Sequence, residues 1–409
     1  MRKKLFFSIL LIFCFVCIFF TTGYTQGFGT VDEATAGNFF VVGARALGMG
    51  GAYTAVANDG SALVYNPAGL ARNSRIEFSG TLTHQRINNH TDIGYGFNDG
   101  RPQNNTRFSS GNVVLPVPTY RGSLVLAFGV NRVKSFDKAM QFSSNDGVTT
   151  SRAIESQSGG LYLWSFGAGV DVSPNISVGG ALNLWTGKES YSWYYIDSSS
   201  AHTNIIDDMI KDRYTGFNAK LGVRIQPNKY LVIGGTIDSP VTYTIKEDVT
   251  QTTNQEGNSW NSEYKISLPF SLGAGVALSF NNLILAGDIN YTDWTQMEYK
   301  RFDYIADANR RIKDVYTDAL RWHLGSEFLI PQISTTLRAG FYRDPLPYQS
   351  QWIIKNRNFF TTGVGFLIDQ VMTLDIAWAH GSWETWDVDW NLAEKYTANQ
   401  IYLSTAYRF

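Results

Sequence analysis

The sequence predicts an all-β protein, a transmembrane antiparallel β-barrel of about 14 strands with an N-terminal plug inside its lumen. Apolar and polar residues alternate over stretches that exceed the mean strand length of a soluble protein, about 5–6 residues. Short turns alternate with long connections, and a Gly- and Ala-rich segment precedes the first strand. The composition includes 22 Tyr, 26 Phe, 11 Trp and 38 Gly, with only 17% charged residues. This composition is typical of a sheet that faces lipid on one side.

The segment 1–26 has the features of a secretory signal peptide. Basic residues at 2–4 precede an apolar run at 5–20, and small or polar residues follow. The run is shorter than the roughly 18 residues expected of a spanning helix. Both cysteines, Cys14 and Cys17, lie within it. The mature chain is therefore expected to have no cysteine, which excludes a disulfide framework and thiolate metal sites.

The stretch from Tyr264 to Phe280 shows the strand pattern most clearly. Every even position is apolar, and the odd positions are mainly Ser and Gly. A membrane strand needs about 9–11 residues to cross the core, so this length favours a barrel strand with alternate residues facing lipid. Pro269 cannot donate to the ladder, so we expect a bulge or kink there. The pattern recurs at 162–172, 215–225 and 401–409.

The connections between these strands alternate in length. Short turns are predicted at 119–123, 173–175, 226–229, 281–282, 331–334 and 369–370. Long, polar and aromatic connections are predicted near 86–107, 135–157, 190–212, 243–260, 298–317, 343–357 and 381–398. Outer-membrane barrels have short periplasmic turns and long external loops, whereas nothing in a soluble β-sandwich requires this alternation. The predicted location is the outer membrane of a bacterium.

The segment 27–73 does not alternate and precedes the barrel predicted at 74–409. A barrel of this size encloses more space than its inward side chains fill, so a compact segment of small residues would fit inside as a plug. Pro67 suits the first position of a short helix, and Asn66 suits its N-cap. Taken alone, these two residues indicate a cap and a turn.

Three segments carry further motifs. The first, at 43–71, reads GARALGMGGAYTAVANDGSALVYNPAGLA; the second, at 285–299, reads LAGDINYTDWTQMEY; the third, at 318–347, contains a Trp-bearing strand, a short turn and LRAGFYRDPLP. Together they resemble FadL and TodX, the outer-membrane transporters of long-chain fatty acids and hydrocarbons. The resemblance implies a fourteen-stranded barrel with an N-terminal hatch. It implies passive uptake of fatty acids or similar hydrophobic compounds, which enter a barrel pocket and leave sideways through the wall after the hatch shifts.

The resemblance also implies roles for particular residues. The residues that match the hatch motif are Asn66, Pro67, Ala68 and Gly69. Apolar residues near the mature N-terminus are candidates for contacting a ligand tail, or else pack the plug against the wall: Phe28, Phe39, Phe40 and Val41. Arg45 or Arg338 could bind a ligand carboxylate; the alternative is a salt bridge within the lumen.

The plug also resembles that of the PorV-like barrels, which act as partners or shuttles in type IX protein secretion. This alternative function leaves the fold unchanged. The expected surroundings are outer-membrane lipid and lipopolysaccharide, with Trp294 interpreted as part of an aromatic girdle at the headgroups; the alternative is an external apolar groove that first captures the ligand. The aromatic C-terminus, Phe409, resembles the signal read by the barrel-assembly machinery.

Several other classes of function are not supported. The formal net charge of −1 gives no basic face for nucleic acid. The glycines near Met49 lack the context of a phosphate loop, and the five histidines are dispersed without metal-ligand spacing. No Gly-x-Ser-x-Gly elbow is present. We therefore expect no cofactor, no metal and no enzymatic activity.

Overall fold

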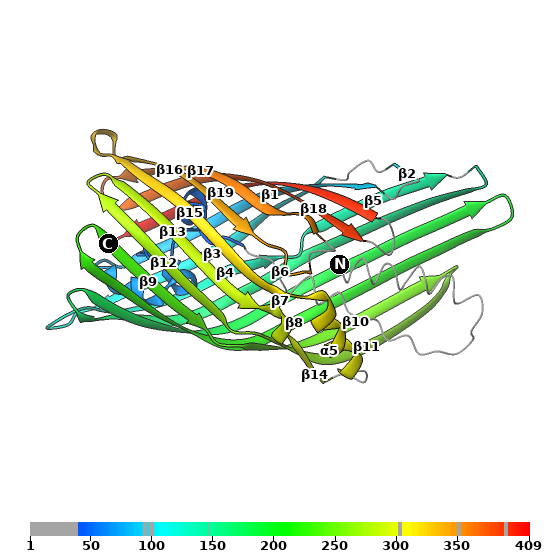
Figure 1. Ribbon diagram of the computed structural model, residues 1–409, viewed down its shortest axis with the longest axis horizontal. Coiled ribbons are helices and arrows are strands. Elements are labelled where there is room, and N and C mark those ends of the chain that lie inside the picture. The colour runs from blue at the N-terminus through cyan, green and yellow to red at the C-terminus, as the bar shows by residue number, and fades with distance from the viewer. Residues whose placement is uncertain are drawn as a thin grey trace.

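The computed structural model describes residues 40–92, 96–97, 102–145, 147–301, 305–349, 353–387 and 392–409. Its strands form one antiparallel sheet that closes on itself, because β1 (Glu77–Asp92) pairs with β19 (Leu392–Arg408). Figure 1 shows an elongated barrel with the first helical segments, in blue, inside one end. The segment 1–26 lies outside the described residues.

The plug contains three short helical segments: α3 (Ala44–Gly48), α4 (Ala62–Tyr65) and η1 (Pro67–Arg72). The remaining elements of the first half are β2 (Gly96–Phe97), β3 (Gln103–Val117), β4 (Leu124–Ser135), β5 (Lys138–Asn145), β6 (Thr149–Ser173), β7 (Ile176–Ser199), β8 (Thr203–Asn228), β9 (Leu231–Asp238) and β10 (Val241–Thr253). Those of the second half are β11 (Glu256–Leu268), β12 (Ser271–Phe280), β13 (Leu283–Asp293), η2 (Trp294–Gln296), β14 (Glu298–Arg301), α5 (Ile305–Val315), β15 (Asp318–Ile330), η3 (Pro331–Ile333), β16 (Thr335–Asp344), β17 (Ile353–Ile368) and β18 (Met372–Asp387).

Within the described residues the wall has fourteen strands, which confirms the predicted number. Four of them are each broken into two segments: β4–β5, β9–β10, β11–β12 and β13–β14. The short segment β2 forms a two-residue antiparallel pair with β5. All six predicted short turns join consecutive strands at one end of the barrel, and the C-terminus lies at that end (Figure 1). We take this end as periplasmic and the other as external.

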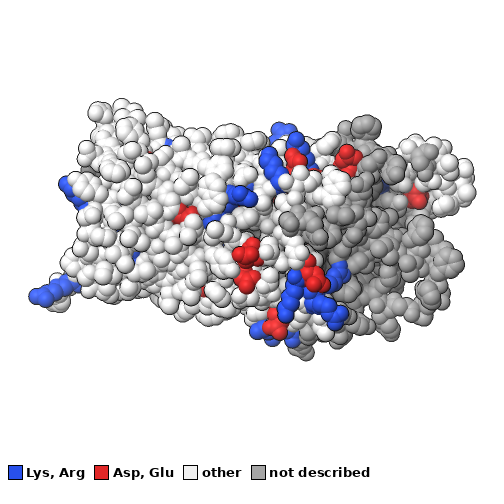
Figure 2. Space-filling view, in the orientation of Figure 1, with Lys and Arg blue, Asp and Glu red and all other residues white. Residues whose placement is uncertain are grey.

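Outward side chains form an apolar belt around the wall. Trp164 and Phe166 on β6 are exposed, as are Ile401 and Leu403 on β19. In Figure 2 the half of the barrel near the short turns carries few charged side chains, and Lys, Arg, Asp and Glu gather toward the middle. The predicted lipid-facing alternation is therefore confirmed for these strands.

The stretch 264–280 forms two segments with opposite faces rather than one lipid-facing strand. In β11, Tyr264 and Ile266 are buried inside the barrel, whereas in β12 Leu272 and Phe280 are exposed. The chain breaks at Pro269, which has no N–H for the ladder. The predicted kink is confirmed. The prediction of a single face is wrong, because the break shifts the alternation by one residue relative to the wall.

Much of the sequence predicted as long external loops is also strand. The pairs β6–β7 and β7–β8 remain hydrogen-bonded out to Thr149↔Ser199 and Ser198↔Thr203. These extensions lie on the external side of the apolar belt. Aromatic side chains such as Tyr191 and Trp193 pack inside the barrel there. Among the described residues, no helix is both long and apolar enough to cross a membrane.

Candidate functional site

Asn66 ties the plug to the wall at the start of η1. Its amide nitrogen donates to the Thr54 carbonyl at 2.9 Å and to the Val223 carbonyl of β8 at 3.0 Å. Its amide oxygen accepts from the Ala68 N–H at 3.1 Å, and Pro67 occupies the first helical position. The predicted cap is confirmed. The same fully buried side chain also joins the plug to the barrel.

Glycines on the inward face of the wall allow this close contact. A Cβ added to Gly222 of β8 would overlap the Asn66 amide oxygen. One added to Gly179 of β7 would overlap the carbonyl carbon of Pro67. Glycine lets two backbones approach this closely, because it has no side chain to separate them. The Asn66–Gly69 motif therefore rests directly on the backbone of the wall.

One further group anchors the plug to the wall, and another stabilises the plug itself. Asp288 of β13 accepts from the backbone N–H groups of Tyr53 and Thr54, both at 2.7 Å. The hydroxyl of Tyr65 accepts from the Val42 N–H at 2.9 Å. Burial raises the pKa of the Tyr65 phenol well above its ordinary value, so the hydroxyl stays neutral. Asn66 and Asp288 thus hold the plug to the wall at two separate points, whereas the Tyr65–Val42 bond is internal to the plug.

On the periplasmic side, an ion-pair network joins the plug to three wall strands. Arg45 of α3 donates to both carboxylate oxygens of Glu327 on β15, each at 2.8 Å. Arg338 on β16 donates to Glu327 and to Asp375 on β18, each at 2.7 Å. Burial alone would lower the pKa of Arg45, but the attraction of Glu327, Tyr53 and Asp59 together with the hydrogen bond to Glu327 outweighs it, so the pKa lies well above its ordinary value. Both arginines that the sequence suggested as carboxylate partners are thus paired with wall carboxylates.

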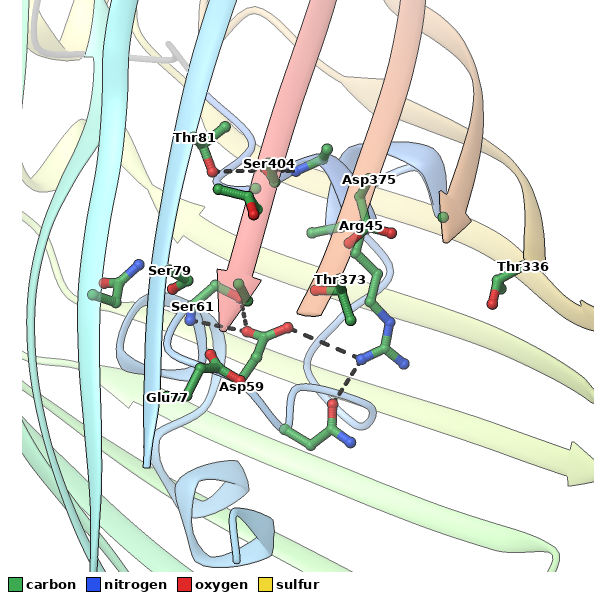
Figure 3. A pocket seen from close by; sticks show the side chains of 18 of the residues that line it. Arg45, Asp59, Ser61, Glu77, Ser79, Thr81, Thr336, Thr373, Asp375 and Ser404 are labelled. Atoms are coloured by element: carbon green, nitrogen blue, oxygen red, sulfur yellow. Dashed lines mark hydrogen bonds and ion pairs between the residues drawn. The ribbon is translucent and has the colours of Figure 1, made fainter. Parts of the chain in front are cut away.

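A cavity of about 310 Å³ lies between this network and the plug. Figure 3 shows Arg45 and Asp59 of the plug facing Asp375 and Thr373 of the wall. Glu77 and Ser404 also line the cavity. Because its lining is largely charged or hydroxylic, this space suits water and polar groups rather than an apolar ligand.

A second cavity, of about 200 Å³, lies on the external side of the plug. Apolar and aromatic side chains contribute half of its lining residues, including Phe40 and Tyr65 from the plug and Trp185 from β7. Three basic side chains, Lys134, Lys220 and Arg321, also line it, and Lys220 pairs with the lining carboxylate Asp238 at 3.1 Å. An apolar pocket with a few convergent polar groups is the usual form of a small-molecule site.

All four broken strands border this second cavity. The lining includes Lys134 just before the β4–β5 break, Val241 at the β9–β10 break, Pro269 at the β11–β12 break, and Trp294 between β13 and β14. The breaks therefore share one level of the barrel. The girdle interpretation of Trp294 is wrong: the side chain is only 7% exposed, because η2 turns it into the lumen. Its ring centre lies 5.5 Å from the Lys134 ammonium.

An apolar cluster surrounds this space inside the external half of the barrel. It includes Leu161, Tyr243 and Ile266 from the wall. Ile312 and Tyr316, from α5 and the residue that follows it, pack into the same cluster. The inward-facing part of the 264–280 stretch thus contributes apolar side chains to the lumen on the external side of the cavity.

The wall has a break in its backbone ladder beside the cavity. β3 and β4 pair from Val117↔Leu124 to Ser110↔Asn131. Beyond that level, the described residues 103–109 pair with β1, whereas 132–135 pair with β6. Side chains fill the break: Arg107 donates to Asp137 at 2.7 Å, and Arg132 donates to the same carboxylate at 2.8 Å.

Phe40 connects the plug to this ladder break. Its ring lines the second cavity and lies 5.4 Å from the Arg132 guanidinium. Val41 is buried in the plug core. Phe28 and Phe39 lie outside the described residues. Phe40 is therefore the predicted tail-contacting residue that the structure brings to a cavity.

Sequence reasoning missed Lys134, Arg321 and Asp137. The local pattern RVKSFDK at 132–138 contains a signal, because it places the basic residues 132, 134 and 138 on the same face of a strand. Such residues would face the lumen rather than lipid. Arg321 has no comparable local signal. Among the described residues, no group of three or more His, Cys, Asp or Glu side chains is arranged to hold a metal ion.

Comparison with known proteins places these features in a family. The family model of the outer membrane protein transport proteins (OMPP1/FadL/TodX) matches residues 30–403. No curated protein sequence matches the chain.

Solved structures share the fold at low sequence identity. A FadL homologue from Pseudomonas aeruginosa has a TM-score of 0.65 and 15% identity over 91% of this chain and 100% of its own. The toluene transporter TodX of P. putida has a TM-score of 0.59 and 13% identity over 90% and 99%. The monoaromatic hydrocarbon channel CymD has a TM-score of 0.59 and 15% identity over 91% and 99%. The chain belongs to the OMPP1/FadL/TodX family, and it is a bacterial outer-membrane barrel for transport of hydrophobic compounds, not an enzyme.

Proposed function

We propose that this barrel conducts long-chain fatty acids passively across the outer membrane. The observation that supports this most is the second cavity, where an apolar lining includes Lys134 and Arg321. The acyl chain would pack against the aromatic residues and the apolar cluster, which is favourable by about 25 cal/mol per Å² of apolar surface buried. The carboxylate would face Lys134 and Arg321, because the third basic side chain, Lys220, already pairs with Asp238. No energy source beyond the concentration gradient is needed.

The exit we propose is the ladder break between β3 and the β4–β5 strand. No backbone hydrogen bonds between the described residues 103–109 and 132–135 must be broken there. The plug closes the periplasmic side with charged groups, so a sideways path into the membrane avoids the polar cavity. Phe40 lies between the ligand space and Arg132, so a bound ligand that displaces Phe40 would disturb the Arg132–Asp137 pair.

Replacing Lys134 with methionine is expected to weaken binding of dodecanoate about tenfold or more, since a charge-assisted contact is lost. Binding of toluene should change little, because methionine preserves the apolar stem. Isothermal titration in detergent would measure both affinities. Lys395→Met is the control, because Lys395 is an exposed side chain on the outer face of β19. Equal dodecanoate affinities in all three proteins would contradict the fatty-acid assignment.

Cross-linking the ladder break is expected to stop uptake reversibly. In an Arg107→Cys/Asp137→Cys variant, a short cleavable bis-thiosulfonate reagent would join residues whose native side chains are 2.7 Å apart. Fatty-acid uptake in cells should fall after cross-linking and recover on reduction. The matched control is Thr186→Cys/Thr215→Cys, which lies across a continuous part of the β7–β8 ladder. Full uptake by the cross-linked protein would rule out this exit.

A further inference from the structure

Three cationic residues lie in register on neighbouring strands. Lys188 of β7 is directly opposite Arg213 of β8, and Arg213 is directly opposite Lys246 of β10. The Arg213 and Lys246 side chains are 57% and 63% exposed. Neighbouring strands lie about 4.8 Å apart, so the three side chains span about 10 Å of the outer wall. We call this set the cationic row.

The cationic row lies just beyond the external edge of the apolar belt. On the same face, Leu184 of β7 is opposite Phe217 of β8, and the two side chains are 49% and 59% exposed. The row is four residues farther along each strand, about 13 Å before strand tilt is considered. The strands lead from the belt toward the external side, so the row lies at the level of the outer-leaflet headgroups.

Like charges placed directly opposite in a ladder are unfavourable, so the row needs anionic partners. The wall supplies only part of this charge. Arg213 pairs with Asp248 at 2.8 Å, and Lys246 pairs with Glu263 at 3.8 Å. Two further cations flank the row on the same face: Lys211, opposite Asp248, and Lys265, opposite Thr244. Positive charge therefore exceeds negative charge on this patch.

The same strands hold carboxylates on their other face. Glu189, Asp212 and Glu247 are in register with one another and buried in the lumen. Each immediately precedes or follows a member of the cationic row in the sequence. Since successive side chains point to opposite faces of a strand, these carboxylates cannot neutralise the row. The missing anions must come from outside the barrel.

We propose that the cationic row binds the phosphate groups of an outer-leaflet phosphoglycolipid, the lipid A portion of lipopolysaccharide. The height of the row matches a headgroup, and its charge is complementary to a phosphate that can accept bonds from two neighbouring cations. The acyl chains would then lie along Leu184, Phe217 and the belt below them. This surface is on the outer wall and is separate from the second cavity inside the barrel, so the site does not depend on the proposed substrate.

The test is the affinity of the detergent-purified barrel for lipid A, measured by native mass spectrometry. The variant Lys188→Gln/Arg213→Gln/Lys246→Gln is expected to bind bis-phosphorylated lipid A about 100-fold more weakly. Dephosphorylated lipid A should bind both proteins equally weakly. Heat-modifiable gel migration would verify that the variant barrel is folded, and dodecanoate binding should be unchanged.

A matched variant, Arg152→Gln/Lys355→Gln/Lys395→Gln, removes three cations from β6, β17 and β19 and should retain lipid A. Equal loss in both triple variants would overturn the proposal, because it would show a non-specific charge effect. Undiminished binding by the row variant would also overturn it. If inorganic phosphate alone binds the row as tightly as lipid A does, the site is one for free anions rather than a lipid surface.

Discussion

Replacing Asn66 with alanine is expected to loosen the Asn66–Gly69 motif from the barrel wall while the fourteen-stranded wall stays folded. The substitution removes two buried donor contacts, to the carbonyls of Thr54 and Val223, and the cap to the Ala68 N–H. Leaving these backbone groups without partners should cost about 3 kcal/mol locally. Hydrogen exchange of the amides in 62–73 should therefore quicken strongly, whereas exchange in the β7–β8 ladder should be unaffected.

Asn58→Ala is the matched control for this experiment. Asn58 is also in the plug, but its side chain is exposed. It accepts a hydrogen bond at 2.7 Å from Arg45, which is another plug residue. Its loss should leave exchange in 62–73 near the native rate. Equal protection of 62–73 in native and Asn66→Ala proteins would show that packing against the wall glycines Gly179 and Gly222 is enough to hold the motif.

Replacing Glu327 with glutamine is expected to have the second large effect. Glu327 accepts from Arg45 and Arg338 together, and its side chain is only 10% exposed. Without its charge, two largely buried guanidinium groups lose a shared partner, and removing one member of a buried pair costs about 3–5 kcal/mol. The plug should detach from β15, opening the polar cavity. Planar-bilayer recordings should then show an ion conductance larger than that of the native barrel.

The control is Glu384→Gln, which removes a carboxylate whose pairing with Lys395 at 3.8 Å lies on the outer face. Its conductance should equal that of the native protein, because exposed pairs contribute little. If Glu327→Gln conducts no better than this control while remaining folded, the network stabilises the wall without controlling access through the plug.

The sequence predicted the barrel well because both of its signals are local. Alternation at Trp164 and Phe166 follows from the two faces of a strand, and the short turns follow from Gly, Pro and Asn at strand ends. The Asn66 cap was likewise readable, since it depends on residues two positions apart. Alternation alone does not say which face is inside. The prediction therefore extended the lipid-facing direction of β12 across Pro269, and this was wrong for Tyr264 and Ile266, which face the lumen.

The residues of the ligand space and of the ion-pair network could not be predicted in the same way. Arg45 and Glu327 are 282 residues apart, and Asn66 and Val223 are 157 apart. Lys134, Pro269, Trp294 and Arg321 lie in segments far apart in the sequence and meet only around one cavity. No periodicity within a segment records which strands face each other across the lumen.

The sequence by itself determined the strand number, the turns, the lipid-facing pattern and the family, because each is encoded within single segments of the chain. Tertiary structure decided where the plug contacts the wall, which arginines are paired, where the ladder breaks, and which cations align on the outer face. These features depend on register and closure, which bring segments distant in sequence to within a few ångströms. Burial then makes each polar contact between them energetically consequential.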